Sequence, residues 1–282
     1  MTRLLLILAL FGLATAASAQ DRADYDRPVA PFRIAGNLYY VGTAGIAAYL
    51  VTDPAGHVLI DGATAESADG IAASIRALGF RVEDVRLLLQ SHAHWDHVGG
   101  LAALKRASGA RLLASAADRP ALETGRTDYR DDVGTFPPVA VDGTIGDGEV
   151  VRLGATAITV HLTPGHTKGG TSYTLAVTEQ GRRLDVLIAC SLTVANQRLV
   201  GDAGYPGAAS DFETTFARLA ALRADIFLAG HTGSFGFAEK RARLAAGDAF
   251  AFVDAAELAA QLARARAAFE EELARQRSAA AD

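Results

Sequence analysis

The chain has 282 residues, of which 50% are apolar and 21% are charged, a balance typical of a globular protein long enough to bury a large core. Its formal charge is −5 at pH 7 and no cluster of lysine or arginine stands out, which argues against nucleic acid as a partner. Because Cys190 is the only cysteine, an intramolecular disulfide is excluded and stability must come from the core, with bound metal as a further source.

The first residues have the pattern of a secretory signal peptide. One positive charge, on Arg3, precedes an apolar stretch at 4–13, and the small residues 17–19 (Ala-Ser-Ala) follow. About ten apolar residues are too few for the roughly 20 that span a bilayer, so a cleaved signal is favoured over a membrane anchor. We predict a signal peptide at 1–19, one domain at 20–282, and export to the periplasm with no membrane attachment after cleavage.

Strand-type runs and helical patterns alternate in the first half of the chain. Apolar runs bounded by glycine, proline and aspartate predict strands at 38–41, 47–52, 57–60, 85–90 and 111–114. Helical periodicity predicts helices at 65–78, 101–107 and 116–123. A polar loop follows at 125–138, and a loop of that length often borders a binding site.

The second half repeats this strand-rich character. Strands are predicted at 150–153, 157–162, 172–177, 184–189 and 226–229. A helix is predicted at 212–222, and a long final helix has one apolar face formed by Leu258, Leu262, Ala265, Phe269 and Leu273. No linker separates the halves, so we expect a single layered α/β domain in which the halves pack sheet on sheet.

Four metal-ligand side chains lie within six positions directly after the predicted strand 85–90, in the sequence His92-Ala93-His94-Trp95-Asp96-His97. His92 and His94 are two apart in an extended segment, so their side chains project to the same side and can bind one cation. Asp96 and His97 follow in the turn and can face a second cation. The adjoining Gly99-Gly100 lets the backbone bend sharply, and the motif therefore predicts a metal site.

Two further histidines, His166 and His231, each follow a predicted strand, so three strand ends carry ligand candidates. Zinc accepts imidazole nitrogen and carboxylate oxygen, and a catalytic zinc site keeps three protein ligands with an open position for water. Six ligands divide naturally into two such sites. His57 and His161 lie inside strand patterns with no neighbouring ligand, and we expect both to be structural.

Other nucleophiles find no support in the sequence. It contains no G-x-S-x-G elbow, no S-x-x-K, no phosphate-binding G-x-x-x-x-G-K and, with one cysteine, no C-x-x-C. A metal-bound hydroxide is the remaining obvious nucleophile.

Three segments, HAHWDHVGG, TPGHTKGG and AGHTGSFGFAEKRARL, together resemble the metallo-β-lactamase superfamily and, within it, the subclass B3 enzymes. The resemblance covers nearly the whole chain after residue 19. It implies a four-layer αββα sandwich with the metals at one edge, and two Zn²⁺ per chain. By the same resemblance the first zinc would be held by His92, His94 and His166, and the second by Asp96, His97 and His231.

The residues after strand 184–189 distinguish the branches of this superfamily. Glyoxalase II-type thioesterases, lactonases and phosphodiesterases typically carry a metal-bridging aspartate there, whereas this chain has Cys190-Ser191-Leu192-Thr193. Subclass B1 lactamases use a cysteine ligand in this region, but HAHWDH and the neighbouring Ser191 favour B3, so we expect Cys190 to be a buried small residue. By resemblance to B3, Ser191 would bind the substrate carboxylate, with Thr193 as a second hydroxyl candidate.

The predicted function is zinc-dependent hydrolysis of the β-lactam ring of penicillins, cephalosporins or carbapenems by a metal-bound hydroxide that catalytic Asp96 orients, conferring antibiotic resistance. The expected partner is a small-molecule β-lactam, and we expect a monomer. Two alternatives stay open. One is a related zinc hydrolase of a lactone, thioester or phosphodiester; the other is a non-enzymatic periplasmic zinc-binding protein.

Overall fold

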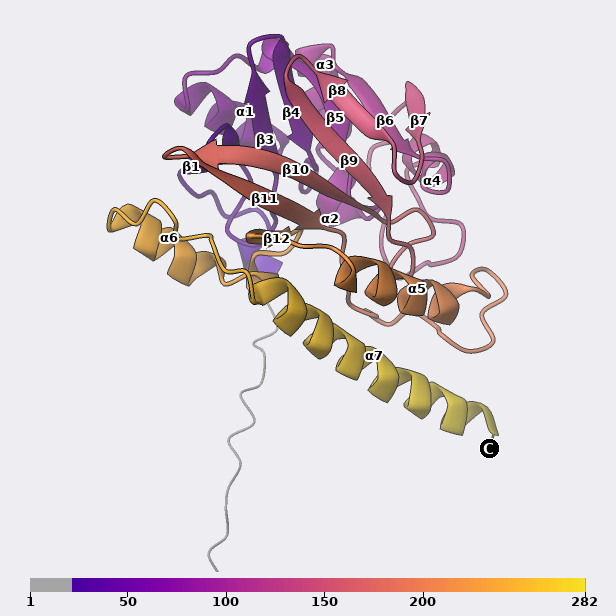
Figure 1. The fold of residues 1–282 in the computed structure, drawn as a ribbon. Coiled ribbons are helices and arrows are strands. Elements are labelled where there is room, and N and C mark those ends of the chain that lie inside the picture. Colours follow the sequence, from indigo (N-terminus) through magenta and orange to yellow (C-terminus); the bar gives the residue numbers. More distant parts are fainter. Residues whose placement is uncertain (1–21, 282) are drawn as a thin grey trace, which may run out of the picture.

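Two β-sheets lie face to face at the centre of the computed structural model, and helices cover their outer faces (Figure 1). The structure describes residues 22–281, so the predicted signal segment 1–19 and its cleavage site lie outside the described residues. Helices α1 (Ala68–Ala77) and α3 (Leu101–Ser108) lie against the first sheet, and α5 (Ala208–Ala220) and α7 (Glu257–Ala281) against the second. The predicted αββα sandwich is confirmed.

The first sheet has seven strands that follow one another in chain order. They are β1 (Phe32–Ala35), β2 (Leu38–Tyr40), β3 (Tyr49–Asp53), β4 (Gly56–Ile60), β5 (Val85–Leu89), β6 (Arg111–Ser115) and β7 (Gly143–Ile145). The first four pair antiparallel and the rest pair parallel. All five residues of β4 are buried, because β4 and β5 are parallel strands covered on both faces.

The second sheet has five strands in the order β12-β11-β10-β9-β8. They are β8 (Val150–Leu153), β9 (Thr156–Leu162), β10 (Thr171–Glu179), β11 (Arg182–Ala189) and β12 (Ile226–Ala229). Only the β11–β12 pair is parallel, and α5 lies in the connection between those two strands. The remaining helices are short: α2 (Trp95–Val98), α4 (Arg119–Thr124), α6 (Phe237–Ala245), η1 (Arg22–Asp24), η2 (Val82–Asp84) and η3 (Thr232–Ser234).

Strands β1 and β7 and helix α6 were not predicted from the sequence. Both strands are short, the apolar residues of β1 are interrupted by Arg33, and β7 has one apolar residue besides glycine, Ile145. Helix α6 buries only Phe237 and Lys240, and the Lys240 ammonium is paired with the Glu257 carboxylate of α7. An ion pair formed across the fold leaves no apolar periodicity in the sequence.

The core divides between the two sides of the first sheet. A larger group of apolar side chains fills the space between the sheets and continues beneath α5 and α7, and a second group lies under α1 and α3. The predicted apolar face of the final helix is confirmed, since Leu258, Leu262, Phe269 and Leu273 are buried and Ala265 packs beside them. Within residues 22–281, no helix has the length and apolar character needed to cross a bilayer.

The last turns of α7 hold the irregular segment between β11 and α5. The Gln276 side-chain oxygen accepts hydrogen bonds from the backbone N–H groups of Leu199 (2.6 Å) and Val200 (3.2 Å). Its amide nitrogen donates to the carbonyl of Gln197 at 3.0 Å. One side chain thus satisfies three backbone groups of a segment that has no regular secondary structure of its own.

Candidate metal centre

The six predicted ligand side chains meet at one edge of the sandwich, where β5, β9 and β12 end. They form two groups, His92 with His94 and His166, and Asp96 with His97 and His231. Within each group the ligand atoms lie within 4.8 Å of one another. The segment after β5 supplies four of the six, while the β9–β10 turn and the residue after Gly230 supply one each.

Two glycines make the sharp corner after this motif possible. A Cβ on Gly99 would lie 2.4 Å from the carbonyl oxygen of Trp95, and a Cβ on Gly100 would lie 2.2 Å from that of Gly62. Both distances are below van der Waals contact and involve backbone atoms, which cannot move aside easily. Glycine is therefore needed for α2 to lie against the 62–65 segment, and this contact sets the direction of the ligand side chains.

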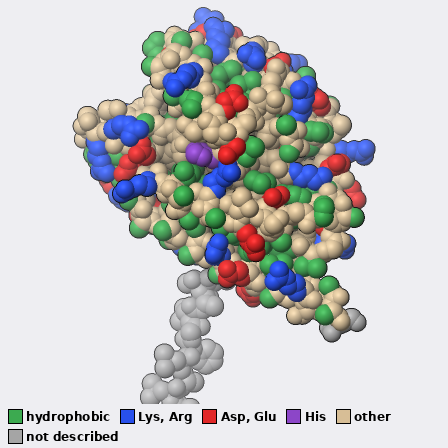
Figure 2. Space-filling view, turned by 45° about the vertical axis from the view of Figure 1, so that its right-hand side comes forward, with side chains coloured by type: hydrophobic (Ala, Val, Ile, Leu, Met, Phe, Trp, Pro, Cys, Tyr) green, Lys and Arg blue, Asp and Glu red, His purple; other side chains and the backbone are tan. Residues whose placement is uncertain are grey.

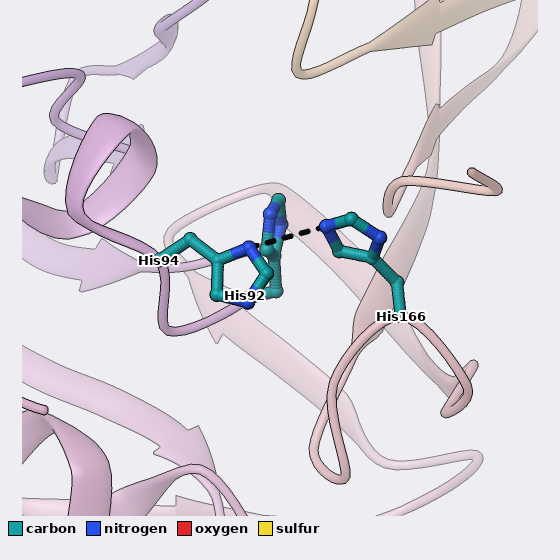
Figure 3. A group of neighbouring side chains, drawn as sticks. All are labelled: His92, His94 and His166. Atoms are coloured by element: carbon teal, nitrogen blue, oxygen red, sulfur yellow. Dashed lines mark hydrogen bonds between the residues drawn. The ribbon is translucent and has the colours of Figure 1, made fainter. Parts of the chain in front are cut away.

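In the first group, His94 and His166 point toward one another, with His92 beside them (Figure 3). The His94 Nδ1 and His166 Nε2 atoms are 3.2 Å apart, and the ring centroids of the three imidazoles are 4.7 to 4.8 Å apart. All three side chains are buried. Three imidazoles converging in this way form a donor set suited to one cation.

Hydrogen bonds on the outer side of the rings fix which nitrogen faces inward. The Ser91 hydroxyl donates to the Asp61 carboxylate at 2.7 Å, so its oxygen accepts from His92 Nδ1–H at 2.9 Å. His166 Nδ1–H donates to the carbonyl of Thr193 at 2.7 Å. The Nε2 atom of His92 is left buried with no hydrogen-bond partner in the described part of the chain, which is what a metal-facing nitrogen requires.

The second group adds a carboxylate. The Nε2 atoms of His97 and His231 are 3.1 Å apart, and Asp96 Oδ2 lies 3.5 Å from each of them. Asp61 Oδ2 lies 3.6 Å from His97 Nδ1 on the other side of the ring. Two imidazoles and a carboxylate are a donor set that Zn²⁺ accepts, so the residues of both groups fit the metal that the sequence predicts.

The electrostatics of the site keep most of these imidazoles neutral, the form that binds a cation. Burial, with the neighbouring imidazoles as a second cause, lowers the pKa of His92 and His94 well below the usual value. Burial likewise lowers the pKa of His166 to about 4 and that of His231 to about 3. At His97 burial is opposed by the charges of Asp96 and Asp61, which together raise its pKa.

The predicted substrate-side residues lie on the segment that contacts His166. The hydroxyls of Ser191 and Thr193 are 3.0 Å apart and Thr193 is exposed. Cys190 is buried, and burial raises the pKa of its thiol, so it is a protonated core residue that belongs to neither metal group of the described chain. Lys168 is paired with Asp128 at 3.1 Å and lies over the ring of Tyr129.

The second group reaches solvent through His231, whose side chain is 25% exposed, whereas that of His97 is fully buried. The space-filling view in Figure 2 shows acidic and basic side chains interspersed over one face of the molecule. The two histidines expected to be structural lie away from both ligand groups. His57, in β4, contacts Phe80, and His161, in β9, is hydrogen-bonded to Thr174.

One residue that sequence reasoning missed is Asp118. Its buried carboxylate accepts hydrogen bonds from the Ala93 N–H (3.0 Å), the Gly169 N–H (2.9 Å) and the Thr167 hydroxyl (3.2 Å). Burial raises its pKa to about 6, and these donors oppose the shift. Asp118 thereby joins the segment of His92 and His94 to the segment of His166.

Replacing Asp118 by asparagine is expected to lower the free energy of unfolding by about 1–3 kcal/mol, because an amide NH₂ then faces one of these buried donors. Chemical denaturation measures the change. Asp128→Asn is the matched control, since its side chain is 80% exposed and its loss should cost under about 0.5 kcal/mol. Equal stability of the two variants would contradict a joining role for Asp118.

Curated relatives of the chain include several hydroxyacylglutathione hydrolases. The chain is 32% identical over 130 residues to the hydroxyacylglutathione hydrolase of Jannaschia sp. (strain CCS1). The aligned region covers 45% of this chain and 41% of that enzyme. It is 28% identical over 185 residues to the enzyme of the same name from Acidiphilium cryptum (strain JF-5), 65% of this chain and 63% of that one. The chain thus spans less than two thirds of these relatives.

Solved structures match over a longer part of the chain. BJP-1, a subclass B3 metallo-β-lactamase of Bradyrhizobium japonicum, is 39% identical with a TM-score of 0.86, over 91% of this chain and 98% of that one. The FEZ-1 metallo-β-lactamase from Legionella gormanii is 36% identical with a TM-score of 0.87, over 89% and 98%. The family model of the metallo-β-lactamase superfamily matches residues 41–231. The chain therefore belongs to the metallo-β-lactamase superfamily, with subclass B3 enzymes as its structural neighbours.

Proposed function

We propose that this hydrolase of the metallo-β-lactamase fold opens the β-lactam ring of penicillins, cephalosporins or carbapenems with two Zn²⁺ ions, and so confers resistance to them. The observation that carries the proposal is the pair of ligand groups, His92 with His94 and His166 beside Asp96 with His97 and His231. Similarity to subclass B3 lactamases over about nine tenths of the chain supports the choice of substrate. Export to the periplasm and a monomeric state are part of the same proposal.

When bound, zinc supplies Lewis acidity toward the amide carbonyl and activates water at neutral pH. The chain's own residues do the rest. The five imidazoles and Asp96 would hold the cations. The Asp96 carboxylate, which lies 3.5 Å from both His97 Nε2 and His231 Nε2, would also orient the attacking water and accept its hydrogen bond. The hydroxyls of Ser191 and Thr193 donate to the substrate carboxylate at the open side of the site.

A thioesterase of the hydroxyacylglutathione hydrolase type is the second candidate, favoured by the curated relatives. Against it stands the segment after β11. Cys190 occupies the position where the resemblance associates that branch with a bridging aspartate, and its thiol is buried and protonated. Both metal groups are complete without a carboxylate from this segment.

The test compares substrates on the same preparation. We expect purified protein to hydrolyse at least one β-lactam, to lose this activity on chelation and to regain it with Zn²⁺. A glutathione thioester, a lactone and a phosphodiester are assayed beside the β-lactams. Faster turnover of the thioester would favour the second candidate, and about two zinc ions per chain with no hydrolysis of any substrate would favour a zinc-binding protein.

A further inference from the structure

The guanidinium of Arg130 is buried beside the metal centre with part of its hydrogen-bonding capacity unused. Its side chain is 6% exposed, although it belongs to the 125–138 loop. Nε donates to Asp132 Oδ1 at 2.8 Å, and Nη2 donates to Asp132 Oδ2 at 2.5 Å and to the carbonyl of Ala195 at 2.6 Å. Nη1 is buried with no hydrogen-bond partner within residues 22–281. Of the five N–H groups of the arginine, two are therefore unpaired.

The contacts of Arg130 place this group next to the substrate side of the site. Ala195 is two residues from Thr193, whose carbonyl accepts from His166 Nδ1–H. On the other side, the preceding residue Tyr129 accepts a hydrogen bond from the Lys168 N–H at 3.3 Å, two residues after His166. The guanidinium thus contacts the segment that accepts the His166 hydrogen bond, and the neighbouring Tyr129 contacts the turn that carries His166.

The loop holds the arginine backbone in place, because the Thr127 hydroxyl donates to the Arg130 carbonyl at 2.8 Å. A fixed, buried cation with free donors has the features of an anion-binding group.

We propose that Arg130 determines specificity for anionic substrates, with Nη1 donating to the carboxylate beside the scissile ring and acting together with the hydroxyls of Ser191 and Thr193. This inference rests on the proposed function and adds a residue to it. The bidentate side of the guanidinium, Nε with Nη2, is taken by the two oxygens of Asp132, so the Nη1 hydrogens are the donors left for the carboxylate. The bonds from Nε and Nη2 to Asp132 and Ala195 position the guanidinium before the substrate arrives.

The experiment compares a chromogenic cephalosporin with its carboxylate methyl ester, which keeps the shape and removes the charge. We expect Arg130→Gln to raise KM for the free acid about tenfold or more, to change kcat little, and to leave KM for the ester within about twofold. Arg130→Lys should recover part of the loss, since it keeps the charge but lacks the planar fork. Arg126→Gln is the matched control, an exposed arginine of the same loop, and should behave as wild type.

A purely structural role predicts a different pattern. If Arg130 only joined the two loops, Arg130→Gln would weaken turnover of acid and ester equally and lower the melting temperature. That result, or an acid-to-ester preference equal to that of Arg126→Gln, would overturn the inference. Thermal melting of all variants separates loop loosening from loss of recognition.

Calorimetric binding of the ring-opened product and of its methyl ester separates this inference from the proposed function. If the wild type hydrolyses a β-lactam and the ratio of acid to ester affinity is the same in Arg130→Gln, the role of Arg130 is overturned. The lactamase proposal is then unaffected. If the wild type binds the free acid and Arg130→Gln does not, but no β-lactam is hydrolysed, the lactamase proposal is overturned and the anion site is retained. Neither hydrolysis nor selective acid binding would overturn both.

Discussion

Asp96→Ala is expected to lower kcat for a β-lactam by about 10²–10⁴-fold and to reduce bound zinc from about two to about one per chain. The carboxylate lies at the same distance, 3.5 Å, from the two imidazoles of its group, so under the proposed function its removal takes away a ligand and the group that orients water. The first group shares no side chain with the second and should keep its metal. Metal analysis and β-lactam hydrolysis on one preparation measure both effects.

Asp69→Ala serves as the control for this substitution, because Asp69 is an exposed carboxylate in the first turn of α1. Its activity and zinc content should equal those of the wild type. An Asp96→Ala protein that retains both full zinc content and full kcat would contradict the assignment of Asp96 to the second group.

Gly230→Ala is expected to disturb the second ligand group from outside it. A Cβ at this position would lie 2.6 Å from His97 Cε1 and 2.9 Å from His97 Nδ1, and His97 is fully buried, so its ring has no free space to enter. The backbone that carries His231 would have to move instead. We expect unfolding to become easier by about 1–3 kcal/mol and activity to fall about 100-fold.

A glycine-to-alanine substitution where the added Cβ meets no neighbour is expected to stabilise the protein instead. Gly70 lies in α1 with no atom within 4 Å of the added Cβ, so Gly70→Ala should raise the free energy of unfolding by about 0.5–1 kcal/mol and leave hydrolysis unchanged. Denaturant titrations of the two variants test the pair. If Gly230→Ala melts and hydrolyses like Gly70→Ala, the close approach to His97 does not constrain the site.

The residues that supply the six ligand side chains could be predicted because each lies after a strand, and β5, β9 and β12 end at one edge of the sandwich. Their division into two sets of three was implied by the resemblance to the subclass B3 enzymes. His166 and His231 are far apart in the chain, yet β9 and β12 deliver them to the same edge. The layered fold was likewise legible from the alternation of short apolar runs with helical patterns. Local periodicity was sufficient for the layered α/β class, whereas the αββα arrangement and the two ligand sets were implied by the family resemblance.

The residues around the ligands could not be predicted, because their roles depend on contacts across long sequence distances. Asp118 accepts from a backbone N–H 25 residues before it and from another 51 residues after it. Arg130 reaches a carbonyl 65 residues away. A buried aspartate or arginine in such a position looks in the sequence like any polar residue of a surface loop.

The Gln276 side chain near the end of α7 is synthesised late, yet it holds a segment close to the ligand groups. It satisfies the backbone of Leu199, which is made 77 residues earlier, on the segment that continues from Ser191 and Thr193. All six ligand side chains precede α7 in the chain and can group before it is complete. A nascent chain that stops short of residue 276 would therefore contain all six ligand side chains while the segment that we propose to receive the substrate still lacks this anchor.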